Sequence, residues 1–451
     1  MQAFTRKKRY KAKDPAETVA GIQAILKDTG INVREERRYE DAPDVASCRI
    51  WLSDADIGFA DFGTNGKGMN AEYSLASAYG EMMERLQNFI LFGDYPEDVF
   101  RKGLTRFMTA PDEVMLDAEE AYDEGRSVID KLMRIDGEDR SFLNYAGRDK
   151  MPCVPYLDLF EDRQILLPHK TLRMVTGSNG MCAGNTYMEA VTQGLSELYE
   201  RAAVMECYRD DPVIRKIDPE QFRGNAIYDR LKRLESKGFG FSILDLSMGK
   251  NYPVVGLLLE KDGKKAFKAG ADPCPVTALE RCLTETFQGT EREISGLFKS
   301  ECCPPFKDAD LRSRYMINDA EIAYHVDGSG KAAYCLFNPK DEYTDSFKGT
   351  DAESERSDYE YMISLTKKLG YSLYIRDWSF MGFPAYHVVV PEISNYDLLY
   401  EDGGDIYGFS FDKIEFRQDR LTEGCARILN RMFEKYENNT PVQDKSMQEQ
   451  I

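Results

Sequence analysis

Two segments of the chain carry the same pattern, and this internal repeat constrains the fold more than any other feature. Residues 65–85 begin with Asn-Gly-Lys-Gly and residues 179–201 begin with Asn-Gly, and both continue through a glycine-rich loop into a predicted helix. In each helix a polar residue is followed one turn later by Glu-x-x-Glu-Arg. The matched pairs are Ser77 and Gln193, Glu81 and Glu197, Glu84 and Glu200, and Arg85 and Arg201. Since a solvated surface has no reason to repeat a pattern, the sequence predicts two related loop-helix halves that share a site.

The spacing of the acidic residues predicts that this site binds phosphate through metal ions. At 100° per residue, Glu189, Gln193, Glu197 and Glu200 fall within one quadrant of the second helix, with Arg201 at its edge. A glycine-rich loop before a helix exposes backbone N–H groups and is a physical anion site. Carboxylates cannot bind phosphate directly, so a cation must lie between them. Mg²⁺ is the usual bridge.

A purely structural interpretation of the same residues stays open. Thr186 and Glu189 fit a capping box, in which the glutamate only satisfies backbone donors of the first helical turn. Acidic helix faces are also usually solvated faces. The second copy of the pattern is the observation that favours a binding site.

Composition narrows the class of protein. The chain has 451 residues and is 42% hydrophobic, which is enough for a large core. Its net charge of -19 argues against broad nucleic-acid binding. No apolar run approaches a membrane span and the basic N-terminus has no apolar segment behind it, so we expect a cytoplasmic protein without a membrane partner. The ten cysteines form no CxxC pair and the three histidines lie far apart, so no zinc pattern is present.

The remaining segments predict an α+β fold. Apolar spacing predicts a helix over residues 15–28, with Thr18 near its start. Alternating patterns predict strands within residues 47–62, 152–168 and 242–260.

Further along, a third helix is expected to start near Thr277, with Thr277 and Glu280 as its capping box. This helix carries three polar residues on one face, Arg281, Glu285 and Gln288. Residues 302–319 are expected to be irregular. We expect one domain over residues 1–438 and a flexible polar tail over residues 439–451.

In these segments the chain closely resembles the YcaO family. The first two motifs are TNGKGMNAEYSLASAYGEMMERL and SNGMCAGNTYMEAVTQGLSELYER, and ALERCLTETFQ after GADP resembles the third. KDPAETV near the start and GFPAYHVVVPEIS near residue 390 resemble further family segments, so the resemblance runs roughly from Lys13 to Ser394. It implies a YcaO-type fold, with two pseudo-repeated loop-helix halves around a nucleotide site. Family members bind ATP without a Walker loop, and this chain likewise has no GxxxxGK[ST].

What the resemblance implies is ATP- and Mg²⁺-dependent activation of a peptide backbone amide. The family phosphorylates the amide oxygen after a nucleophile adds to the carbonyl carbon. The nucleophile is a neighbouring Cys, Ser or Thr side chain, which gives an azoline, or a sulfur donor, which gives a thioamide. Carried over by motif position, the Mg²⁺ ligands are Glu81, Glu84, Glu189 and Glu200, which act in catalysis together with Arg281. The ATP-binding residues are Lys13, Thr18, Ser77, Asn185, Glu197, Arg201, Arg281, Glu285 and Gln288.

The resemblance also implies an alternative function and a set of partners. It is greatest to stand-alone bacterial members linked to methylthiolation of a small-subunit ribosomal protein. The alternative is therefore an ATP-binding accessory factor that acts through a partner enzyme. The expected partners are a peptide or protein substrate and a sulfur-donating or peptide-recognition protein, and the family implies a homodimer. A plain metal-dependent hydrolase is a poorer alternative, because no His or Asp completes a water-activating site.

Overall fold

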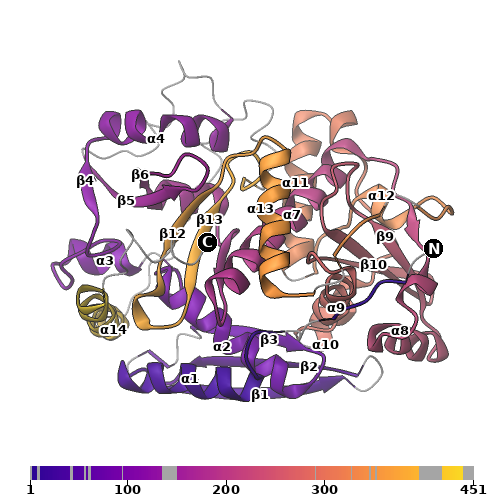
Figure 1. Ribbon diagram of the computed structural model, residues 1–451, viewed down its shortest axis with the longest axis horizontal. Helices are drawn as coiled ribbons and strands as arrows, with labels where there is room; N and C mark the ends of the chain where they lie inside the picture. The colour runs from indigo at the N-terminus through magenta and orange to yellow at the C-terminus, as the bar shows by residue number, and fades with distance from the viewer. Residues whose placement is uncertain are drawn as a thin grey trace.

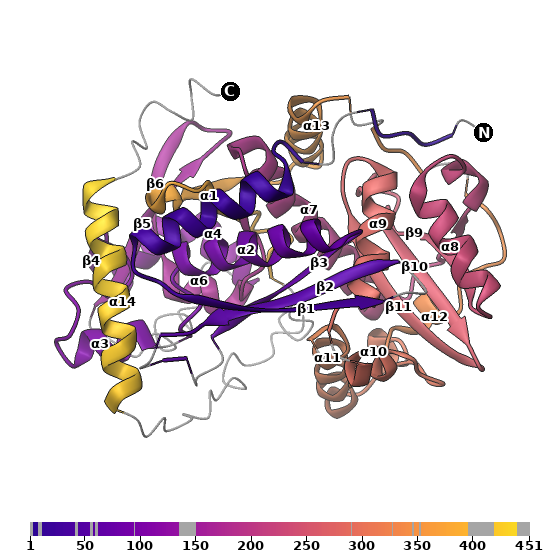
Figure 2. The same cartoon turned by 90° about the horizontal axis from the view of Figure 1, so that it is seen from below.

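Three antiparallel sheets, each with an edge strand that leads directly into a helix, define the architecture of the computed structural model (Figure 1). The structure describes residues 3–7, 11–40, 44–54, 57–58, 62–93, 95–134, 150–289, 291–326, 328–344, 347–350, 353–395 and 419–439. Seen from below, the first sheet crosses the middle of the molecule between the other two (Figure 2).

The first sheet has the order β1-β2-β3, with β1 (Val33–Glu40), β2 (Val45–Leu52) and β3 (Gly63–Gly68). The second sheet has the order β11-β10-β9-β8, with β8 (Lys216–Ile217), β9 (Gly240–Asp245), β10 (Val254–Lys261) and β11 (Lys264–Ala271). The third has the order β4-β5-β12-β13-β7, and β6 also pairs with β5. Its strands are β4 (Val114–Leu116), β5 (Met151–Asp158), β6 (Arg163–Pro168), β7 (Met181–Ala183), β12 (Tyr374–Asp377) and β13 (Ala385–Val389).

The helices fill the spaces between and around the sheets (Figure 1). In the first half of the chain they are α1 (Pro15–Asp28), α2 (Ala71–Gln87), α3 (Tyr95–Arg101), α4 (Ala118–Met133), α6 (His169–Thr176) and α7 (Tyr187–Asp210). In the second half they are α8 (Ala226–Ser236), α9 (Pro275–Thr286), α10 (Glu291–Leu297), α11 (Leu311–Val326), α12 (Tyr334–Phe337), α13 (Glu355–Lys368) and α14 (Asp419–Asn438). Short 3-10 helices span Pro219–Phe222, Phe306–Asp308 and Ser379–Met381.

The helix predicted over residues 15–28 is confirmed as α1. Asp14 caps it and forms a capping box with Glu17, which satisfies the first backbone donors. Its apolar stripe, Val19, Ile22 and Leu26, is buried and packs in the core shared with α2. Each such side chain contributes about 2 kcal/mol of burial free energy.

The prediction of loops before the repeated helices is wrong in one respect. Asn65 to Gly68 belong to strand β3, and residues 181–183 form strand β7, so each unit is a strand followed by a helix. Gly66 sits in β3 because a Cβ there would lie 2.0 Å from the Ser74 carbonyl oxygen of α2. The glycine therefore permits close strand-helix packing and does not form an anion-binding loop.

Of the other secondary-structure predictions, some are confirmed and some are wrong. The strands expected within residues 152–168 and 242–260 are confirmed as β5, β6, β9 and β10. The third helix, expected to start near Thr277, is confirmed as α9, which begins at Pro275. Its cap residue Cys274 makes no side-chain cap hydrogen bond, so the predicted capping box of Thr277 and Glu280 is wrong. Residues 311–326 form helix α11 where irregular structure was expected. The predicted tail lies, from residue 440 onwards, outside the described residues.

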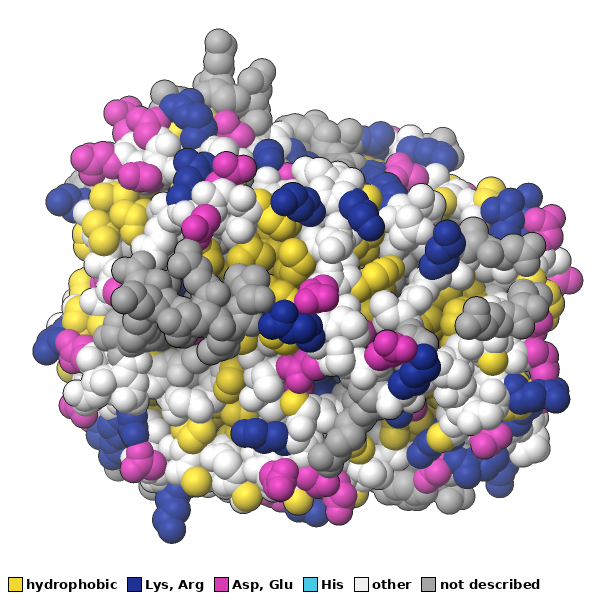
Figure 3. All heavy atoms as spheres, viewed as in Figure 1, with side chains coloured by type: hydrophobic (Ala, Val, Ile, Leu, Met, Phe, Trp, Pro, Cys, Tyr) yellow, Lys and Arg dark blue, Asp and Glu magenta, His cyan; other side chains and the backbone are white. Residues whose placement is uncertain are grey.

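The surface gives no sign of a membrane-spanning or strongly basic region in the parts that can be seen. Among the described helices, none combines the length and the apolar character that crossing a bilayer requires. On the face shown in Figure 3, lysine and arginine side chains are interspersed with aspartate and glutamate side chains.

Candidate active site

The helices that follow the three edge strands line one cavity of about 910 Å³. They are α2 after β3, α7 after β7 and α9 after β11, and they begin at Ala71, Tyr187 and Pro275. Counted from these starts, the seventh, eleventh and fourteenth residues of each unit point to the cavity. These residues are Ser77, Glu81 and Glu84 in the first unit, Gln193, Glu197 and Glu200 in the second, and Arg281, Glu285 and Gln288 in the third. The repeat therefore has three copies, of which sequence comparison found two.

Close packing of strand on helix is common to all three units. A Cβ on Gly270 of β11 would lie 2.3 Å from the Ala278 carbonyl oxygen, as one on Gly66 would meet Ser74. In the second unit the glycine is on the helix instead, because a Cβ on Gly194 would lie 2.9 Å from the Cys182 sulfur of β7. The strand and helix therefore pack closely in every unit, whether the glycine that permits it is on the strand or on the helix.

The three glutamates at the eleventh position each have a cation beside their carboxylate. Arg85 donates to Glu81 over 2.8 Å, and Arg201 donates to Glu197 over 3.4 Å. The Lys67 ammonium contacts Glu285. Burial alone would raise the pKa of Glu285, but Lys67 and Lys268 hold it below the ordinary value, so this carboxylate is ionised at neutral pH.

Glu84 and Glu200, at the fourteenth position, differ from these three glutamates. Neither carboxylate has a hydrogen bond or an ion pair within the described part of the chain. Burial, followed by the neighbouring charges of Glu197 and Glu81, raises the pKa of Glu84 well above its usual range. Burial and then the Glu285 charge raise the pKa of Glu200 to about 7. The charges of Arg85, Arg201 and Lys67 offset only part of these rises. A divalent cation would stabilise both carboxylates in the ionised form.

Glu189 lies at the start of α7, where the N-terminal segment crosses the cavity. Its carboxylate lies 3.3 Å from the Lys11 ammonium and accepts the Ala12 backbone N–H over 3.0 Å. The Asn185 amide lies 3.3 Å away and in turn accepts the Thr18 hydroxyl over 2.8 Å. Burial raises the pKa of Glu189, but Lys11 and these donors lower it by more, so the net shift is downward. Thr186 caps α7, yet Glu189 does not complete the capping box considered from sequence, because it turns to the N-terminal segment.

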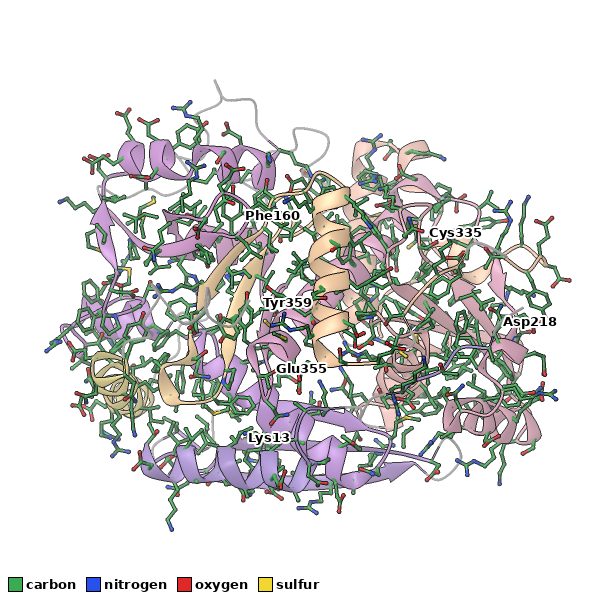
Figure 4. The ribbon with its side chains drawn as sticks, in the orientation of Figure 1. Lys13, Phe160, Asp218, Cys335, Glu355 and Tyr359 are labelled. Carbon is green, nitrogen blue, oxygen red and sulfur yellow. The ribbon has the colours of Figure 1, made fainter. Side chains whose placement is uncertain are left out.

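The remaining predicted residues also line the cavity. Arg281 pairs with Asp272 over 3.3 Å, and the Gln288 side chain donates to the Asn65 carbonyl oxygen over 3.3 Å. Gln288 lies past the end of α9, which stops at Thr286, and not on its face as predicted. Lys13 lies just before α1. In Figure 4 it is below Glu355, a residue in the first turn of α13. Glu355 accepts the Thr186 hydroxyl and so supports the start of α7.

All thirteen residues assigned to ATP, Mg²⁺ or catalysis from the sequence line this one cavity. Sequence reasoning missed the cavity-lining lysines Lys11, Lys67 and Lys268. Lys67 stood inside the first motif, where only its glycines were interpreted. Residues 281, 285 and 288 have the same spacing as residues 77, 81 and 84 of the first helix. This spacing was the signal that could have revealed the third unit.

The side chains present fit Mg²⁺ held jointly with a phosphate ligand. In the part of the chain that the structure describes, no three His, Cys, Asp or Glu side chains converge to hold a metal ion by themselves. Mg²⁺ is usually bound through one or two carboxylates together with substrate phosphates, so a complete protein cage is not required. The unpaired oxygens of Glu84 and Glu200 supply the donors that such a site needs.

A large cavity that holds carboxylates without ion pairs, together with arginines, is suited to a polyanion bound with divalent cations. Residues 65–394, more than half of the chain, match the family described as YcaO cyclodehydratase, ATP- and Mg²⁺-binding. The chain therefore belongs to the YcaO family, whose cofactors are ATP and Mg²⁺.

Relatives and solved structures agree with this assignment. The ribosomal protein S12 methylthiotransferase accessory factor YcaO of Escherichia coli (strain K12) is 28% identical over 407 residues, or 84% of this chain. The chain spans 64% of that protein's length and 66% of a 27% identical, uncharacterized protein of Haemophilus influenzae.

Two solved structures share the fold. A heterocyclase in complex with substrate and cofactor matches with a TM-score of 0.56 at 16% identity, covering 87% of this chain and 54% of its own. YcaO from Methanopyrus kandleri, bound with AMPPCP and Mg²⁺, matches with a TM-score of 0.50 at 16% identity, covering 86% of this chain and 93% of its own.

Proposed function

We propose that the protein binds ATP with Mg²⁺ between α2, α7 and α9 and uses it to activate a backbone amide of a peptide or protein. The observation that carries this proposal is the pair Glu84 and Glu200. These carboxylates occupy the same position on two repeated helices, face one cavity and have no direct ion pair or hydrogen bond among the described residues. Membership of the YcaO family and the likeness to a heterocyclase support it. The activated amide would become an azoline or a thioamide according to the nucleophile.

Each group of residues has a distinct role in this proposal. Glu81, Glu84, Glu189 and Glu200 would hold Mg²⁺, and Arg201 and Arg281 would donate forked hydrogen bonds to phosphate oxygens. When bound, ATP would supply the phosphoryl group, and Mg²⁺ would supply positive charge that balances the carboxylates. The other nucleotide-binding residues would be Lys13, Thr18, Ser77, Asn185, Glu197, Glu285 and Gln288.

A chemical reason couples ATP to this reaction. An amide oxygen is a poor leaving group, and its phosphorylation gives a good one that departs as phosphate. Such a transfer needs charge neutralisation and in-line positioning more than a protein nucleophile. The cavity supports the first of these needs, because Glu81, Glu197 and Glu285 each have a cation, while Glu84 and Glu200 have no ion pair of their own.

A second candidate function is that of an ATP-binding accessory factor acting through a partner enzyme. The name of the Escherichia coli relative favours it, since that protein is a methylthiotransferase accessory factor. Under this proposal the protein binds ATP and a partner protein without modifying a peptide itself. A homodimer, proposed from the family, is compatible with both functions, and light scattering tests it.

Isotope labelling separates the two functions once a substrate peptide has been found. The peptide would carry oxygen-18 in its backbone carbonyl, and released phosphate would be analysed by mass spectrometry. Amide activation predicts the label in phosphate, together with loss of water's mass or exchange of oxygen for sulfur in the peptide. Phosphate that takes its oxygen only from solvent, with peptide mass unchanged, would favour the accessory function.

A further inference from the structure

The three strand-helix units supply the counter-charge of their central glutamate in different ways. In the first two units an arginine one turn further along the same helix reaches back, Arg85 to Glu81 and Arg201 to Glu197. The matching position of the third unit is Gly289. It lies beyond the end of α9 with a φ of +104°, a conformation that favours glycine. The third unit therefore has no arginine at the position that Arg85 and Arg201 occupy, and its other arginine, Arg281, pairs with Asp272.

Lys67 supplies the cation for Glu285 from another unit. It lies on β3, the strand of the first unit, and its ammonium contacts the carboxylate of Glu285 on α9. Both side chains are partly accessible, at 29% and 27%, from the cavity that they line. Next to this contact, Gln288 donates to the backbone carbonyl of Asn65, also on β3. Two contacts thus join the end of α9 to the strand of the first unit.

Lys268 is the other lysine of the cavity near Glu285, and the geometry assigns it a different role. Its ammonium donates to the His325 carbonyl oxygen over 3.3 Å, so it is attached to the end of α11. Lys67 is the lysine that contacts Glu285 directly. Without it, the ionised Glu285 would lose its direct counter-ion, keep only the more distant charges of Lys268 and Arg201, and repel an incoming triphosphate more strongly.

We propose that Lys67 is a positioning residue of the ATP site, which takes the place of the arginine missing from the third unit. It neutralises and orients Glu285, and it fixes the third unit against the first where the nucleotide binds. This inference rests on the proposed function, since it assigns Lys67 a role in the same site.

Calorimetric binding of Mg²⁺–AMPPCP, which needs no peptide substrate, tests the role of Lys67. Lys67→Met should weaken binding roughly 10- to 100-fold, the effect of one lost charge-assisted hydrogen bond. Lys67→Arg retains a donor for Glu285 and should restore most of the affinity. Lys131→Met is the matched control, because Lys131 pairs with Glu392 over 2.8 Å and does not line the cavity. Its affinity should equal that of the unaltered protein.

A double variant distinguishes positioning from direct contact with the nucleotide. If Lys67 acts through Glu285, Lys67→Met combined with Glu285→Gln should bind no more weakly than Glu285→Gln alone. Urea unfolding of each variant should show a folded protein, which separates this role from a structural one. Unchanged affinity in Lys67→Met, or fully additive losses in the double variant, would overturn the inference. Failure of the unaltered protein to bind Mg²⁺–AMPPCP would instead remove the proposed function.

Discussion

The first two strand-helix units and the third have the same backbone arrangement but different charges. The first two present two glutamates and an arginine to the cavity, whereas the third presents Arg281, one glutamate and Gln288. All three strands lie at sheet edges, and all three helices begin at matching positions. The repeated architecture fixes where the side chains point. The changed residue types give the third unit less negative charge than the other two.

We expect this asymmetry to orient the nucleotide. A symmetric ring of six carboxylates would repel a triphosphate from every direction. In the third unit the fourteenth position is Gln288 and the seventh is Arg281, so this unit brings less negative charge to the cavity than the other two. The metal ions would then gather near Glu84 and Glu200, and phosphate oxygens near Arg281.

The largest expected effect comes from removing charge at the fourteenth position of the first two units. Glu84→Gln and Glu200→Gln should each lower ATP turnover roughly a hundredfold or more, because each removes a proposed metal ligand. Gln288→Ala, at the matching position of the third unit, should lower it by about tenfold or less, since it removes a neutral hydrogen-bonding side chain and no metal ligand. Steady-state phosphate release measures all three variants.

Equal losses in the three variants would break the comparison, because the third unit would then be functionally equivalent to the others. Near-normal turnover in Glu84→Gln or Glu200→Gln would remove the metal assignment. Thermal unfolding of each variant provides the control for folding, and it should be close to that of the unaltered protein.

A smaller effect is expected from the close packing that the units share. Gly66→Ala should lower the free energy of unfolding by about 1–3 kcal/mol, because the new Cβ would meet the Ser74 carbonyl at 2.0 Å. Gly21→Ala in α1 is the control, since no atom lies within 4 Å of a Cβ there. It should stabilise the helix by about 0.5–1 kcal/mol. Urea unfolding measures both, and a neutral Gly66→Ala would contradict the packing argument.

The sequence predicted the secondary elements well where local signals decide them. The helix at residues 15–28 has a capping box and an apolar stripe, and both signals are local. Residues 65–68 were predicted as a loop because their glycines are typical of loops, whereas the close approach of α2 is what requires Gly66. That reason depends on a tertiary contact, which a single sequence does not display.

The candidate site was predictable to the extent that its residues repeat. The acidic residues of α2 and α7 stand out because the two segments align with each other and resemble a known family. Lys11 and Lys67 reach carboxylates 178 and 218 positions away, so no local spacing reveals these pairs. The third unit was missed as a repeat because two of its three cavity-lining residues have changed chemical type.

The smallest expected effect concerns the support of the second unit, which alone includes a histidine pair beside its strand. β13 pairs with β7 and carries His387, whose ring contacts the Tyr156 hydroxyl over 2.7 Å. His169 contacts the same hydroxyl over 3.2 Å. Burial lowers the pKa of His387 to about 4, against about 6.5 in the unfolded chain. As pH falls below 6.5 the unfolded chain binds the proton first, so this contribution to stability is full above 6.5 and is lost towards pH 4.

Between pH 7.5 and 5.5 the loss from His387 should be about 1 kcal/mol of unfolding free energy. His387→Gln should reduce the drop in stability between these two pH values by that amount, as measured by urea unfolding. Tyr156→Phe is the control, because it removes the same hydrogen bond and leaves the histidine in place. It should lower stability at both pH values and retain the full drop. The same drop in His387→Gln as in the unaltered protein would show that the pH dependence arises elsewhere, and the second unit would then not differ from the others in this respect.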